Sequence, residues 1–130
     1  MPFKSSTNRT QDVTVGIAAA GNSQATATAL VTEINVVATA TGTSADGVQL
    51  PKAVTGRVVT IYNNTAATIE VWPATGDTVE GGSANAEAVA PTLTKDGRTY
   101  LAISGNEAGP PGVAAATGDW VTIYDVGVVA

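Results

Sequence analysis

The chain has 130 residues, a net charge of −5 and an apolar fraction of 44%, which fits one globular domain with a sizeable core. It contains no Cys and no His, and this excludes disulfides, thiol nucleophiles, Ser-His-Asp triads and histidine-containing zinc sites. An acidic chain without a basic cluster argues against a nucleic-acid partner, and no apolar run is long enough for a membrane span.

The kind of apolar residue predicts an all-β fold. Ala, Thr and Val together supply 60 residues, whereas Leu and Ile supply 10. Val and Thr are β-branched and suit a pleated, half-buried surface, and the alanines alternate with Thr, Gly and Val rather than with helix formers. A core of such small side chains buries little area per residue. We therefore expect additional burial against neighbouring subunits.

The first twelve residues, MPFKSSTNRTQD, are polar and indicate an extended arm rather than a core element. We expect an adjacent subunit to hold this arm, and we expect residues 13–130 to form a single β domain.

The strand patterns begin with VTVGI (13–17) and ALVTEINVVATA (29–40). In the second segment both parities contain apolar residues, which is typical of a strand that contacts the core on one side and a partner on the other. A loop follows at 41–47, and VQLPKAVTG bends at Pro51 because proline cannot donate to a sheet ladder.

Two hairpins are predicted next. RVVTIY (57–62) and ATIEVW (67–72) alternate with period two around an Asn-Asn turn, and in the second strand Ile69 and Val71 share one face while Glu70 and Trp72 share the other. AVAPTLT (88–94) and RTYLAIS (98–104) flank a turn at Asp96-Gly97.

The chain closes with a Gly/Pro/Ala loop at 105–118 and a strand within DWVTIYDVGVV (119–129). About eight strands with turn signals every 8–12 residues predict a single antiparallel β-sandwich, jelly-roll-like or small β-barrel domain.

Four carboxylates are candidates for chemistry. Asp77 and Glu80 could pair with Glu70 or Asp119 as general acid and base, or bind Ca²⁺ through oxygen ligands. However, the DxDxDG spacing of calcium loops is absent, and TGDTVEGG also fits two turns around a short strand. We favour the structural interpretation and expect no catalytic residue, cofactor or metal.

Four aromatic residues allow two interpretations. Tyr62, Trp72, Trp120 and Tyr124 could form a sugar-stacking platform, or they could anchor a Val/Ala core or a subunit interface. The second interpretation is favoured.

The order of motifs resembles a known class of proteins. GVQLPKAVTGRVVTIYNNTAATIEVWPATGDTVEGG (47–82), then APTLTKDGRTYLAIS and TGDWVTIYDV (117–126), is similar to small virion structural proteins of tailed bacteriophages. In these proteins a Gly-Val-x-Leu-Pro opening precedes a strand ending in Asn-Asn, a Trp-Pro-x-x-Gly-Asp segment follows, and a late Trp opens the closing strand. The resemblance spans residues 47 to 126 and consists of turns and strands, not of a catalytic signature.

The resemblance implies a non-enzymatic, β-rich homotrimer on the virion. One expectation is a capsid decoration (cement) protein that binds the major capsid protein on the outer surface of the capsid after synthesis in the host bacterial cytoplasm. A tail or head fibre component is the alternative, but a fibre normally carries a long shaft, and we interpret these 130 residues with their short arm as complete. A carbohydrate-binding module that uses Trp72 or Trp120 ranks third. In the arm, we expect Phe3 to act as an apolar anchor, and Lys4 and Arg9 to contact acidic capsid patches.

Overall fold

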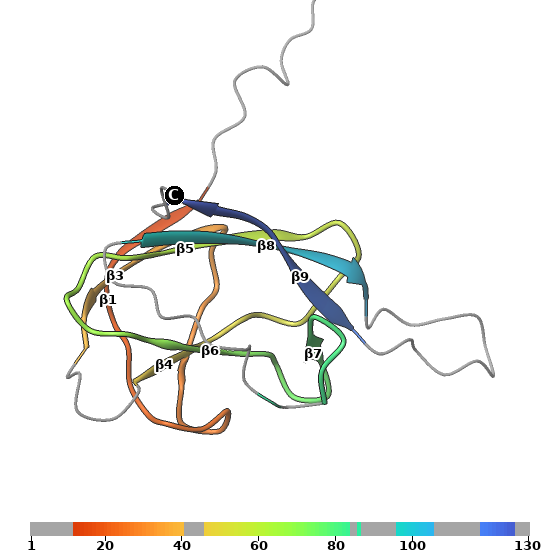
Figure 1. Cartoon of the computed structure of the whole chain (residues 1–130), viewed down its shortest axis with the longest axis horizontal. Coiled ribbons are helices and arrows are strands. Elements are labelled where there is room, and N and C mark those ends of the chain that lie inside the picture. Colours follow the sequence, from red (N-terminus) through yellow and green to blue (C-terminus); the bar gives the residue numbers. More distant parts are fainter. Residues whose placement is uncertain (1–11, 41–45, 84–85, 87–95, 106–117, 127–130) are drawn as a thin grey trace, which may run out of the picture.

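The chain folds into two layers of β-strands that face each other across one hydrophobic core (Figure 1). This computed structural model describes residues 12–40, 46–83, 86, 96–105 and 118–126, and only the backbone of 96 and 124–126. The described residues contain nine strands and no helix. The all-β prediction is therefore confirmed.

The larger layer is a mixed six-stranded sheet with the strand order β1-β3-β5-β8-β9-β7. Its strands are β1 (Val13–Ala18), β3 (Ile34–Thr39), β5 (Val58–Asn63), β8 (Asp96–Ser104), β9 (Asp119–Val126) and β7 (Thr78–Val79). The smaller layer has the order β2-β4-β6, and its strands are β2 (Thr28–Ala29), β4 (Gly47–Gln49) and β6 (Glu70–Trp72).

From β1 to β7 the chain alternates between the two layers, so it winds as a flattened coil. As a result β1, β3 and β5 pair in parallel in one layer, and β2, β4 and β6 pair in parallel in the other. Among the nine strands of the described residues, β8 alone pairs antiparallel, with its neighbours β5 and β9. The expectation of antiparallel pairing throughout was therefore wrong, because alternation along a strand reports its two faces and not the direction of its neighbours.

The core lies between the layers. Its largest fully buried side chains are Trp120 and Tyr100, and Val37, Ile61 and Val71 are also completely buried. In the segment ending at β6 the predicted alternation is confirmed: Ile69 and Val71 are buried, whereas Glu70 and Trp72 are only half-buried. Small β-branched side chains thus fill a thin core around two large rings.

The first predicted hairpin is wrong. Asn63, which was predicted to begin the connection, is the last residue of β5. The next strand, β6, belongs to the other layer, so the connection is an arch between sheets. The Asn63 amide is fully buried: Nδ2 donates to the Ala67 carbonyl at 2.7 Å, while Oδ1 accepts from Thr65 N at 3.0 Å and from Thr65 Oγ1 at 2.7 Å. The pair Asn63-Asn64 is therefore not the turn of a hairpin.

The second predicted turn is also misplaced. Asp96 and Gly97 are the first two residues of β8 and pair with Asn63 and Tyr62 of β5. The strand predicted at 88–94 lies outside the described residues, as does most of the loop predicted at 105–118. The segment 29–40 divides into the end of β2 and the whole of β3.

Candidate functional site

The outer face of the six-stranded sheet carries most of the exposed large apolar side chains of the described residues. Strand alternation directs Asn35 and Val37 of β3 into the core and leaves Ile34 and Val36 on the opposite side. Cross-strand pairing extends this outer side over β5, β8 and β9. We call it the outer face, and define it by Val13, Val15, Ile34, Val36, Val58, Thr60, Tyr62, Thr99, Leu101, Ile103, Val121 and Ile123.

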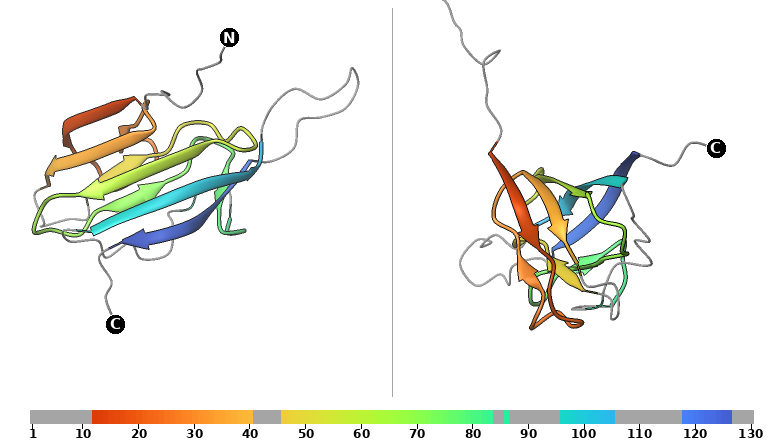
Figure 2. Two further views of the ribbon diagram at one scale, coloured as in Figure 1. Left: turned by 90° about the horizontal axis from the view of Figure 1, so that it is seen from above. Right: turned by 90° about the vertical axis from the view of Figure 1, so that its left-hand side faces the viewer.

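No described element covers the outer face. Seen from above, β1, β3, β5, β8 and β9 lie side by side in front of the smaller layer (Figure 2, left). Among the described residues seven large apolar side chains are strongly exposed, and five of these lie on the outer face: Val15 (69%), Val13 (53%), Ile103 (52%), Ile123 (51%) and Tyr62 (37%). Large apolar patches of this kind mark interaction surfaces.

The outer face is also uncharged. All twelve side chains that define it are aliphatic, hydroxyl-bearing or aromatic. At its centre Thr60 Oγ1 and Thr99 Oγ1 hydrogen-bond each other at 3.0 Å across β5 and β8. These two hydroxyls are thereby paired within the sheet, which lowers the cost of desolvating them when the face is covered.

Sequence reasoning did not single out the outer-face residues Val13, Val15, Ile103 and Ile123. A signal was present, since segments such as VVTIY and TYLAIS contain apolar residues at both parities. Strands buried on both faces have this near-continuous apolar character. In the sequence analysis, apolar residues at both parities are interpreted as a partner contact only for the segment 29–40.

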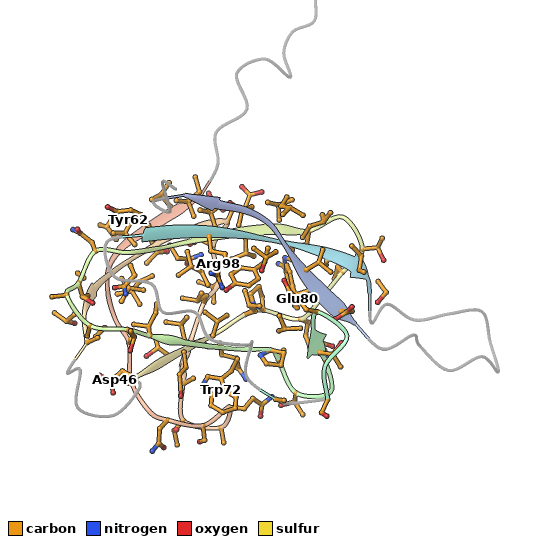
Figure 3. The ribbon with its side chains drawn as sticks, in the orientation of Figure 1. Asp46, Tyr62, Trp72, Glu80 and Arg98 are labelled. Atoms are coloured by element: carbon orange, nitrogen blue, oxygen red, sulfur yellow. The ribbon has the colours of Figure 1, made fainter. Side chains whose placement is uncertain are left out.

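The structure does not bring the four predicted aromatic residues together. Tyr62 lies on the outer face, whereas Trp72 lies on the smaller layer (Figure 3). Trp120 has no exposed surface, so its assignment to an interface is corrected: it is a core residue because β9 turns this position inward beside Ala102. The side chain of Tyr124 lies outside the described residues.

Trp72 packs against its own chain. Its indole ring lies so close to Gly47 of β4 that a Cβ added there would be 2.8 Å from Nε1. Glycine at position 47 therefore allows the ring to lie across the small sheet. The ring is half-buried, so part of it remains accessible.

The candidate carboxylates hold loops in place. Asp77 is fully buried; its Oδ2 accepts from Ala53 N at 2.9 Å, and its Oδ1 lies 3.4 Å from Lys52 Nζ. Asp119 Oδ1 accepts from Thr78 Oγ1 at 2.6 Å. These contacts fix the ends of the short strand β7 and agree with the structural interpretation.

Glu80 has a left-handed backbone, with φ of 52°. Two hydrogen bonds to β9 hold it there: its N–H donates to the Trp120 carbonyl at 2.6 Å, and its Oε2 accepts from Thr122 N at 3.1 Å. Within the described part of the chain, no group of three carboxylates is placed to bind a metal ion.

The remaining predicted site residues, Phe3, Lys4 and Arg9, lie outside the described residues together with the rest of 1–11. No helix in the described residues has the length and apolarity needed to cross a membrane.

Comparison of the chain with protein-family models, curated proteins and solved structures finds no match.

Proposed function

We propose that this chain is a structural protein of a phage virion that decorates the assembled capsid. The observation that carries the proposal is the exposed, uncharged outer face, because an apolar surface of this extent on a small chain favours association with other proteins. The motif order over residues 47–126, which resembles virion structural proteins, supplies the kind of assembly.

The polar residues of the described part also support a structural role. Asp77 accepts a backbone hydrogen bond inside the protein, and Asp119 and Glu80 connect the loop around β7 to β9. The Asn63 amide closes the arch between the two layers. The side chains that suggested chemistry are therefore used to hold the scaffold of the outer face in shape.

The mechanism would be thermodynamic. A protein that binds only the expanded, assembled shell stabilises that shell by mass action. A homotrimer would contact several capsid subunits at once, and this multivalency raises the effective concentration of each contact. We expect the arm to add contacts to neighbouring capsid subunits through Phe3, Lys4 and Arg9.

The test is a binding measurement on purified particles of the phage that encodes the chain. Fluorescently labelled protein is incubated with expanded heads, unexpanded heads and isolated tails, and binding is followed by co-sedimentation. The proposal predicts saturable binding to expanded heads and a higher temperature of DNA release from decorated heads. Binding to isolated tails alone, or to none of the three, would overturn it.

A further inference from the structure

We infer that the outer face binds the outer face of a second copy of this chain, so that copies of the protein associate through their six-stranded sheets. This inference deepens the proposed function, and it rests on that function for the place where the assembly is used. It is carried by the area, the charge and the shape of the face.

The area is close to what a stable interface needs. The five most exposed side chains of the face are 37–69% accessible, and seven half-buried ones lie between them. Together they offer on the order of 600 Å², at the upper end of the roughly 300–600 Å² of the largest apolar patch on a typical monomer and below the roughly 800 Å² that each partner gives to a standard interface. Other residues at the rim would supply the difference.

The charge of the face favours a copy of the same chain. The whole chain carries a net charge of −5, so two copies repel each other wherever their acidic surfaces meet. The twelve described side chains that define the outer face add nothing to this repulsion, because all of them are uncharged. A partner selected through charge complementarity would instead require basic or acidic groups here.

The chemistry of the face is self-complementary. Val and Ile side chains pack equally well against the same residues of a second copy, and the Thr60–Thr99 hydroxyl pair can both donate and accept. When a surface meets its own copy, every group must tolerate groups of its own kind. The outer face satisfies this condition.

The shape is suitable for sheet-on-sheet packing. The face spans five neighbouring strands (Figure 2). The twelve described side chains that define it are Val, Ile, Leu and Thr with one larger ring, Tyr62 (Figure 3). Two sheets pack face to face at about 10 Å with interdigitated side chains of this size. Face-to-face packing of two such sheets gives a two-fold pair, whereas the expected homotrimer would require three outer faces to converge on a common axis, with each face contacting both neighbours.

The test uses the full chain and measures its mass in solution by light scattering and sedimentation across a range of protein concentrations. Ile123→Lys and Ile103→Lys each place a charge on the face at a position that is about half exposed, so the fold of a single copy tolerates them. Val31→Lys is the matched control, because Val31 is 79% exposed but lies between β2 and β3, outside both sheets.

The expected wild-type mass is a multiple of 12.9 kDa, and each outer-face variant should raise the dissociation constant at least 100-fold while the control leaves it unchanged. Circular dichroism and thermal unfolding at high dilution verify that all variants fold. A wild-type monomer at 100 µM, or an oligomer that survives the Ile103/Ile123 double variant, would overturn the inference.

If the wild type is a monomer and Ile123→Lys abolishes its binding to heads, the outer face contacts the capsid instead of a second copy. Failure to bind heads by an oligomer that the variants dissociate would refute the proposed function alone.

Discussion

Replacing Asn63 with Ala should destabilise the protein far more than the same change at its neighbour Asn64. The Asn63 side chain is fully buried and makes three hydrogen bonds that close the arch between β5 and β6. In the variant the buried Thr65 N–H loses its acceptor. By contrast, the Ala67 carbonyl can accept from Thr65 Oγ1, which lies 3.1 Å away and is released from Asn63 by the substitution. The Asn64 side chain is exposed, and its backbone N–H, which donates to the Val37 carbonyl at 2.8 Å, is unaffected by the change.

The magnitude follows from these contacts. An orphaned buried donor costs about 1–3 kcal/mol and the other lost hydrogen bonds about 1 kcal/mol, so Asn63→Ala should reduce the free energy of unfolding by about 2–4 kcal/mol. For a chain of this length 1 kcal/mol corresponds to roughly 3–4 °C, so the midpoint of thermal unfolding should fall by roughly 7–15 °C. Asn64→Ala should cost less than about 1 kcal/mol.

The assay is urea and thermal unfolding of the wild type and the two single variants, followed by circular dichroism at a fixed protein concentration. Equal losses for Asn63→Ala and Asn64→Ala would refute the arch, because they are the result expected for an exposed Asn-Asn turn. A loss below about 1 kcal/mol for Asn63→Ala would show that the buried amide does not hold the two layers together.

Further predictions concern the scaffold and the arm. Asp77→Ala should cost about 2–3 kcal/mol because the Ala53 N–H is left without its acceptor; a loss below about 1 kcal/mol in urea unfolding would contradict this. Gly118→Ala should cost about 1–3 kcal/mol in thermal unfolding, since the added Cβ would lie 2.6 Å from the Cβ of Ala53; a neutral effect would mean that this contact relaxes freely. Deleting residues 1–12 should lower occupancy on expanded heads, measured by co-sedimentation, and unchanged occupancy would remove the arm from the mechanism.

The sequence was sufficient to predict the fold class and the faces of individual strands. β-branched composition and period-two alternation predicted an all-β fold, and the parity of Ile69 and Val71 against Glu70 and Trp72 is reproduced in the structure. These properties are local: they depend on a side chain and on the geometry of its own strand.

Strand pairing could not be predicted in the same way, because it depends on residues far apart in the sequence. RVVTIY and ATIEVW are separated by a short connection that fits a hairpin, but their strands belong to different layers. The buried amide of Asn63 decides between arch and hairpin, and a sequence does not show that Asn63 turns inward while Asn64 stays outside. The same lack of long-range information concealed the placement of Asp96-Gly97 within β8.

The sequence was sufficient to predict one strand with apolar residues on both faces, but not the full set of residues that form the outer face. The mixed faces of 29–40 suggested a strand between a core and a partner, and the structure places Ile34 and Val36 on the exposed outer face. Trp120 was an ambiguous signal, since large aromatic residues are enriched both in cores and at interfaces. Only the register of β9 against β8 assigns it to the core.

A density map of intact particles from cryo-electron microscopy tests the central claim most directly. The account predicts copies of this chain clustered on the outer surface of the expanded head, with their six-stranded sheets turned toward one another and the outer faces covered. Particles without such density, or copies that present the outer face to solvent, would contradict it.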